Sequence, residues 1–212
     1  MRMNKNTTTA QRGRPAKSGR NSSQTKQALV QSGVEYFTEF GFASSGLDKI
    51  LKKVSVPKGS FYHYFASKEA FGIAVIQEYS RYFAKKLDLH LLNEAIEPLQ
   101  RIENFADDAK AGMSRHHFKR GCLIGNLEQE VTLLPESHRQ LLLDTFELWQ
   151  SKIACCLQLA QRTNAINGSL DCNTLANFFW MGWEGAIAKS KLTRDLTPIE
   201  TFMVSFLQLI VK

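Results

Sequence analysis

The chain has 212 residues, of which 43% are hydrophobic and 22% are charged, and its formal net charge is +7. These values are typical of a globular protein with one large domain or two small ones. No apolar run approaches the ~20 residues of a membrane-spanning helix, and the polar N-terminus lacks the apolar stretch of a secretory signal. The cysteines show neither CxxC nor disulfide spacing, so we expect free thiols and a location in the reducing cytoplasm.

The positive charge is concentrated in the first third of the chain. Residues 1–68 contain 12 Lys/Arg and 3 Asp/Glu, a net charge of +9, whereas residues 69–212 contain 15 and 17, a net charge of −2. A basic segment on a nearly neutral body is typical of proteins that bind nucleic acid. A solvated basic tail would give the same excess, so charge alone does not decide between the two.

Residues 1–22 are polar and basic, and we expect them to form a disordered arm. Within the arm, Arg12-Gly13-Arg14-Pro15 resembles the core of an AT-hook. Such a strand lays Arg12 and Arg14 in a narrow A·T-rich minor groove. A tail that only keeps the protein soluble is the alternative.

Three short helices are predicted in residues 23–68. Ser22 or Ser23 can cap a helix that runs to Phe40, where Gly41 ends it. Ser44 and Ser45 offer caps for a second helix over 46–54, and residues 57–63 form a third. The second and third make a helix-turn-helix, the unit that places a helix in the major groove of DNA.

The remaining residues, 69–212, are predicted to form a larger helical domain. Hydrophobic periodicity and Pro, Gly and Asn signals give helices over 67–92, 98–116, 125–132, 135–164, 173–191 and 198–211. No stretch shows sustained alternation of apolar and polar residues, so the predicted fold is all-α.

Residues 56–65 read Val-Pro-Lys-Gly-Ser-Phe-Tyr-His-Tyr-Phe. They crowd hydroxyl, imidazole and ammonium groups onto one turn, while the phenylalanines at i and i+4 can anchor that turn to a core. Together with Tyr36-Phe37, Phe40-Gly41-Phe42 and Ser67-Lys68-Glu69, this stretch resembles the DNA-binding domain of the TetR family of transcriptional regulators. The resemblance assigns contacts with double-stranded operator DNA to Ser44, Ser45, Lys58, Gly59, Ser60, Tyr62, His63 and Lys68.

Two motifs of the second domain resemble a branch of that family that responds to acrylate or to reactive electrophiles. They are Gly-Cys-Leu-Ile-Gly-Asn-Leu-Glu-Gln-Glu-Val at 121–131, and Trp-Met-Gly-Trp-Glu-Gly-Ala at 180–186 followed by Lys191. In part of this branch a sensing cysteine matches Cys122, and its partner lysine matches Lys191. The predicted effector site comprises Met113, His117, Arg120, Cys122, Asn126, Trp180, Trp183, Glu184 and Lys191.

The cysteines differ in what their surroundings predict. Cys122 follows four basic residues, His116, His117, Lys119 and Arg120, which would lower the pKa of its thiol; an inert buried thiol is the alternative. Cys155 and Cys156 are expected to fill the core, and Cys172 to lie exposed in a loop. Neither the cysteines nor the histidines have metal-ligand spacing, so we propose no metal and no cofactor.

Trp180, Trp183 and Glu184 share a helix with Gly182 and Gly185. Glycines allow helices to approach closely, which suits a dimer interface or the wall of an apolar pocket with a few polar groups. An ordinary core, with Glu184 paired to a cation, is the competing interpretation.

The sequence therefore predicts a homodimeric repressor that binds a pseudo-palindromic operator and is released by an unsaturated carboxylate or an electrophile. A thiol-based sensor acting through Cys122 is the alternative. A thiol-dependent enzyme is disfavoured because the chain has no redox pair, Gly-rich cofactor loop or Cys/His/Asp pattern. A DNA-binding protein without an effector would not need so large a second domain.

Overall fold

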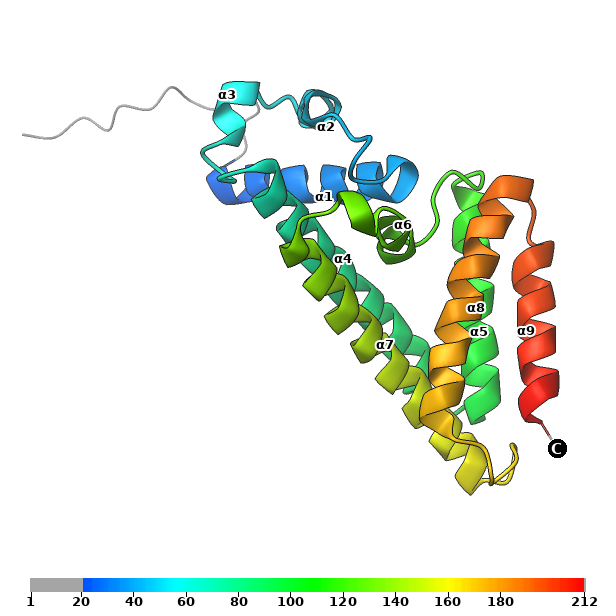
Figure 1. Cartoon of the computed structure of the whole chain (residues 1–212). Coiled ribbons are helices and arrows are strands. Elements are labelled where there is room, and N and C mark those ends of the chain that lie inside the picture. Colours follow the sequence, from blue (N-terminus) through cyan, green and yellow to red (C-terminus); the bar gives the residue numbers. More distant parts are fainter. Residues whose placement is uncertain (1–20, 212) are drawn as a thin grey trace, which may run out of the picture.

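The computed structural model describes residues 21–211, which form nine α-helices and one 3-10 helix (Figure 1). Within these residues no strand forms, in agreement with the all-α prediction. The helices are α1 (Ser22–Phe40), α2 (Leu47–Val54), α3 (Lys58–Phe61), α4 (Lys68–Leu91), α5 (Pro98–Arg115), α6 (Leu123–Gln129), η1 (Val131–Leu133), α7 (Glu136–Arg162), α8 (Cys172–Thr193) and α9 (Thr197–Ile210). In this part of the chain, no helix is both long and apolar enough to cross a membrane.

The first three helices form a small unit around aromatic side chains. Phe37 of α1 meets Phe71 of α4 edge-on, with ring centroids 5.9 Å apart, and Phe61 of α3 meets the same ring at 5.5 Å. All three side chains are fully buried. Because Phe71 belongs to the long α4, the DNA-binding unit is packed onto the first turn of the second domain.

The residues that cap the starts of α1 and α2 are not the ones that the sequence predicted. Asn21, and not Ser22 or Ser23, caps α1, since its side chain accepts a hydrogen bond from the Gln24 amide at 2.8 Å. At the other end Gly41 has φ +77°, in the left-handed region that favours glycine. The chain thereby turns back, and the Ser44 and Ser45 hydroxyls donate to the Phe40 and Gly41 carbonyls. The serine caps predicted for α2 are therefore wrong, and Gly46 precedes that helix without a side-chain cap.

Long helices build the second domain. In Figure 1, α4 and α7 run side by side down the left, α8 packs beside α9 on the right and overlaps α5 in this view, and the short α6 sits beneath α1. An aromatic cluster joins these helices: Phe83 lies 4.3 Å from Trp149, Trp149 5.1 Å from Trp180, and Phe105 5.0 Å from Trp183, centroid to centroid. This core fixes the position of α8, whose Glu184 and Lys191 side chains contact Gly125 and Asn126 of α6.

Candidate DNA-recognition surface and effector site

The surface of α3 carries most of the predicted DNA contacts. Lys58, Gly59 and His63 are exposed, and the Tyr62 side chain is 57% exposed. Inside the same turn Phe61 is fully buried and holds the helix to the core. A Cβ placed on Gly59 would meet nothing within 4 Å, so packing inside the protein does not require glycine there. The exposed side of α3 can therefore approach another molecule closely.

Three other predicted DNA contacts have partners inside the protein. Ser45 is 2% exposed and its hydroxyl donates to the Gly41 carbonyl, and a DNA contact by Ser45 stays a prediction. The Lys68 ammonium donates to the Phe42 carbonyl at 2.9 Å and lies 4.4 Å from the Phe42 ring, while Ser44 remains exposed. A phosphate contact by Lys68 stays a prediction. Arg12 and Arg14 lie outside the described residues.

A cavity of about 520 Å³, the junction cavity, lies where the two domains meet. Its walls come from α1, α4, α5, α8 and the segment before α6. Met113, Arg120, Cys122 and Trp183 of the predicted effector site line it.

Cationic side chains outnumber acids in the lining of the junction cavity. The acids are Glu35, which pairs with Lys53 and Arg120, and Asp108, which pairs with Lys86 at 3.1 Å. Three further lining groups, Lys85, Arg115 and His116, form no ion pair within residues 21–211. The cavity therefore has an excess of positive charge that suits a small anion.

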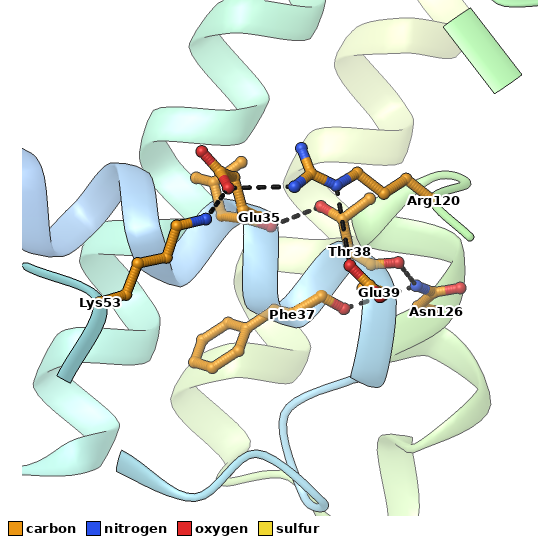
Figure 2. Close-up of polar contacts among 8 residues, drawn as sticks. Glu35, Phe37, Thr38, Glu39, Lys53, Arg120 and Asn126 are labelled. Atoms are coloured by element: carbon orange, nitrogen blue, oxygen red, sulfur yellow. Dashed lines mark hydrogen bonds and ion pairs between the residues drawn. The ribbon is translucent and has the colours of Figure 1, made fainter. Parts of the chain in front are cut away.

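Arg120 connects this cavity to the DNA-binding unit. Its guanidinium lies 3.0 Å from a Glu35 carboxylate oxygen and 3.9 Å from one of Glu39, both on α1 (Figure 2). Glu35 in turn pairs with Lys53 of α2. The hydrogen bond from Lys53, and then the Lys53 and Arg120 charges, lower the pKa of Glu35, so the network is charged at neutral pH.

Two residues around α6 add a second connection to α1. The Asn126 amide donates to the Thr38 carbonyl at 2.6 Å and to the Phe37 carbonyl at 3.4 Å, at the C-terminal end of α1 (Figure 2). On its other side the Asn126 oxygen accepts from Lys191 of α8 at 3.2 Å. The Glu130 carboxylate accepts from the Phe42 and Ala43 amides at 3.0 and 2.7 Å. A movement of α6 or α8 would therefore displace the C-terminal end of α1 through these hydrogen bonds.

A second cavity of about 520 Å³, the α6–α8 cavity, lies on the other side of Cys122. Asn126, Trp180 and Glu184 line it, and α7 contributes the uncharged Phe146 and Gln150. Glu184 is 9% exposed, and its Oε1 has no hydrogen-bond partner among the described residues. Its other oxygen packs on Gly125, where a Cβ would lie 2.0 Å away.

Cys122 occupies the wall between the two cavities and is 5% exposed. Its sulfur accepts a hydrogen bond from the Gly125 amide at 3.5 Å and lies beside the Tyr79 hydroxyl and the Glu184 carboxylate. Burial, and then the Glu184 charge, raise the pKa of the Cys122 thiol well above its ordinary value. Burial also raises the pKa of Glu184 to about 7.

The prediction of a lowered Cys122 pKa is therefore wrong. His116, His117 and Lys119 are exposed, and Arg120 is engaged by Glu35. His117 and Phe118 adopt positive φ and reverse the chain there. The basic residues that precede Cys122 in the sequence are thus not the groups that surround its sulfur.

Comparison with known proteins matches both domains. The family model described as "Bacterial regulatory proteins, tetR family" matches residues 29–75, and "Tetracyclin repressor-like, C-terminal domain" matches 98–206. The chain belongs to the TetR family. It is therefore a transcriptional regulator and not an enzyme.

Three relatives of this TetR-family protein are informative. The transcriptional regulator AcuR of Cereibacter sphaeroides is 44% identical over 92% of this chain and 89% of its own. A crystal structure of a regulatory protein TetR from Rhodobacter sphaeroides superposes with a TM-score of 0.86 at 43% identity, covering 88% of this chain and 99% of that one. The reduced form of NemR, a transcriptional repressor of Escherichia coli, superposes with a TM-score of 0.81 at 28% identity, over 89% and 97% of the two chains.

In this TetR-family protein two predicted effector residues lie outside the walls of both cavities. His117 is exposed in the loop before α6, and His116 lines the junction cavity in its place. Lys191 covers Gly121, the residue before Cys122, with its side-chain carbons, and burial lowers the pKa of its ammonium group. The interpretation that pairs Glu184 with a cation is wrong, because no ion pair involving Glu184 forms within residues 21–211.

The other cysteines also differ from expectation. Cys156 fills the core as predicted, but Cys155 is exposed on α7. Cys172 is the first residue of α8 and is 5% exposed, so the prediction of an exposed loop residue is wrong.

Sequence reasoning missed Glu35, Glu39 and Tyr79 as site residues. Glu35 and Glu39 were visible as two of the three acids in the strongly basic segment 1–68. Tyr79 was visible as a hydroxyl on the apolar face of α4, between Val75 and Phe83. Their partners, however, come from distant helices, so only the fold shows which groups they meet.

Proposed function

We propose that this regulator is a repressor that binds a pseudo-palindromic operator as a homodimer and releases it when a small carboxylate occupies the junction cavity. The observation that carries the proposal is the position of Arg120. The same guanidinium lines the cavity and holds α1 through Glu35 and Glu39. Repression, as opposed to activation, is supported by the name of the NemR relative.

Operator binding is supported by the exposed surface of α3. Lys58, Tyr62 and His63 offer phosphate and base-edge contacts, and Gly59 leaves room for close approach. Each subunit of a dimer would insert its own α3 into one of two successive major grooves.

Dimer formation is supported by apolar side chains on α8 and α9. Phe178 and Met181 of α8 are 44% and 63% exposed, and Val204 and Leu209 of α9 are 55% and 59% exposed. Burying these apolar side chains against a second copy would remove them from water and so stabilise a dimer.

A carboxylate effector is supported by the charge of the cavity. The lining offers an arginine that can bind a carboxylate through two parallel hydrogen bonds, beside Lys85 and Arg115, two cations without ion-pair partners in the described part of the chain. The apolar walls from Met113 and Trp183 suit a short hydrocarbon chain.

Release follows from competition for Arg120. A carboxylate bound to the guanidinium replaces Glu35 and Glu39, which frees α1 to move relative to α6. The effector can shift the equilibrium between the DNA-bound and released states only by the difference in its affinity for the two states. The affinities differ because the carboxylate can make both of its hydrogen bonds to Arg120 only in the released state, where Glu35 and Glu39 no longer occupy the guanidinium.

The test uses an operator fragment selected from random DNA by the purified protein. Fluorescence anisotropy then follows release of the fragment by sodium acrylate. Wild type should release the DNA. Arg120→Gln should bind the fragment more weakly even without acrylate, because it lacks the ion pairs with Glu35 and Glu39, and acrylate should not weaken its binding further. Arg139→Gln is the matched control, since Arg139 lies on α7 outside both cavities and pairs with Glu136, and it should still respond. Equal release from Arg120→Gln and wild type would contradict the mechanism.

Covalent modification of Cys122 is the second candidate route. It is supported by the position of the sulfur between both cavities and by the redox state specified for the NemR crystal structure. The raised pKa of the thiol opposes it, because little thiolate is present at neutral pH. Mass spectrometry of protein released from DNA separates the routes, since reversible binding leaves Cys122 without an adduct.

A further inference from the structure

The wall between the two cavities holds an acid that the carboxylate mechanism does not use. Glu184 is more than nine-tenths buried, its Oε1 lacks a hydrogen-bond partner within residues 21–211, and its carboxylate lies against the Cys122 thiol. Leaving a buried oxygen unpaired costs free energy, so a well-packed core would not contain it without a reason. Its nearest reactive neighbour is the thiol.

We propose that Glu184 is the proton acceptor that lets the buried Cys122 thiol add to activated alkenes, an inference that goes beyond the proposed reversible release and does not depend on it. The thiol alone is a poor nucleophile here because it is buried and protonated. A base in contact with the thiol removes this obstacle, since the proton can leave as the sulfur attacks.

The step balances without any further reactant. The sulfur forms a bond to the β-carbon of the alkene, while the S–H proton moves to the Glu184 carboxylate. The electron pair of the C=C bond moves to the α-carbon, where it is stabilised by the adjacent carbonyl as an enolate. Glu184 then returns the proton to the α-carbon. The net reaction adds S–H across the double bond, and neither oxidant nor reductant is consumed.

Other groups around the sulfur assist the transfer. The Gly125 amide donates to the sulfur at 3.5 Å, and the Tyr79 hydroxyl lies beside it. Both stabilise negative charge that develops on sulfur as the proton leaves. Because Cys122 lines both cavities, an alkene in either one can reach it.

The charges that face this pair determine its pH dependence. Tyr79 reaches it from α4, Glu128 from α6, and Lys191 faces the sulfur from farther along α8. The α7 side of the α6–α8 cavity carries no charged side chain. With a pKa of about 7, Glu184 is largely ionised and able to accept a proton only above neutral pH. Alkylation of Cys122 should therefore rise with an inflection near pH 7.

The experiment treats the full chain with acrylamide, a small neutral activated alkene, and follows each cysteine by peptide mass spectrometry. Cys155 is exposed and serves as the reference thiol in the same sample. At pH 8, Glu184→Gln should slow adduct formation at Cys122 by about 100-fold or more, the usual contribution of a general base. The rate at Cys155 should not change, and operator binding by the variant reports that it is folded.

A second variant keeps the inference testable if Glu184→Gln folds poorly. Glu128→Gln removes a charge that raises the pKa of Glu184. It should keep Cys122 reactive and move the inflection to lower pH.

Equal Cys122 rates in wild type and Glu184→Gln, an unmoved inflection in Glu128→Gln, or no Cys122 adduct in wild type would each overturn the inference. The alkylation rate is measured without DNA. An adduct that forms as described but leaves the operator bound would therefore count against covalent release only, and not against proton transfer by Glu184.

Discussion

Replacement of Glu184 by glutamine should change how the stability of the protein depends on pH. Burial raises the pKa of this carboxyl from 4.5 to about 7. A group whose pKa is raised in the folded state contributes stability that is fully present below the unfolded value and is lost as pH rises through the folded one. Wild type should therefore become less stable between pH 4.5 and pH 7, and this contribution should be absent from Glu184→Gln.

The magnitude follows from the two pKa values. Each pH unit between them corresponds to about 1.4 kcal/mol, so the Glu184 contribution lost between pH 5 and pH 8 is on the order of 2–3 kcal/mol. Glutamine has nearly the same shape and does not titrate. Relative to wild type, the variant should gain about that amount across this range.

Urea unfolding followed by tryptophan fluorescence measures the difference at a series of pH values. One protein concentration is used throughout, because dimerisation makes apparent stability depend on concentration. Other titrating groups are present in both proteins and cancel in the difference. Glu147→Gln, at an exposed position of α7, is the matched control and should follow wild type. Parallel curves for wild type and Glu184→Gln would refute the assignment of a buried, unpaired carboxyl.

Three further substitutions test the DNA surface and the junction. Gly59→Ala should leave unfolding free energy within about 1 kcal/mol of wild type, since its Cβ has open space, yet weaken operator binding about tenfold or more in anisotropy titrations. Lys58→Ala removes a cation whose pair with Asp48 is exposed and contributes little to stability, so the salt slope of operator binding should fall by about 0.9 with no change in unfolding. Gly41→Ala should destabilise the protein by on the order of 2–4 kcal/mol in urea unfolding, because φ is +77° and the new Cβ would lie 1.6 Å from Glu130.

The fold could be predicted closely because its helix ends carry local signals. Gly41 ends α1, Ser67 caps α4 by accepting from the Ala70 amide, and Pro98 begins α5. These signals depend on backbone conformation and on hydrogen bonds within a few residues, which a sequence displays directly. The segment around α3 was predictable for the same reason, since exposed polar side chains and buried phenylalanines alternate within it.

The lining of the junction cavity could be predicted in part from the sequence, but its electrostatics could not. Cys122, Trp183 and Arg120 do line a cavity, yet the charge that dominates Cys122 comes from Glu184 on α8. The chain reversal at His117 directs the nearby cations elsewhere. A pKa depends on neighbours in space and on burial, and neither is visible until the helices are packed.

The central claim is that a carboxylate in the junction cavity and operator DNA favour different states of one protein. Linkage requires the coupling to be reciprocal, so the operator must weaken effector binding by the same factor by which the effector weakens operator binding. Isothermal titration of sodium acrylate into the free protein and into its operator complex measures this factor directly. The account predicts weaker acrylate binding to the complex, with a ratio equal to the loss of operator affinity at saturating acrylate. Equal acrylate affinities for free protein and complex would contradict it.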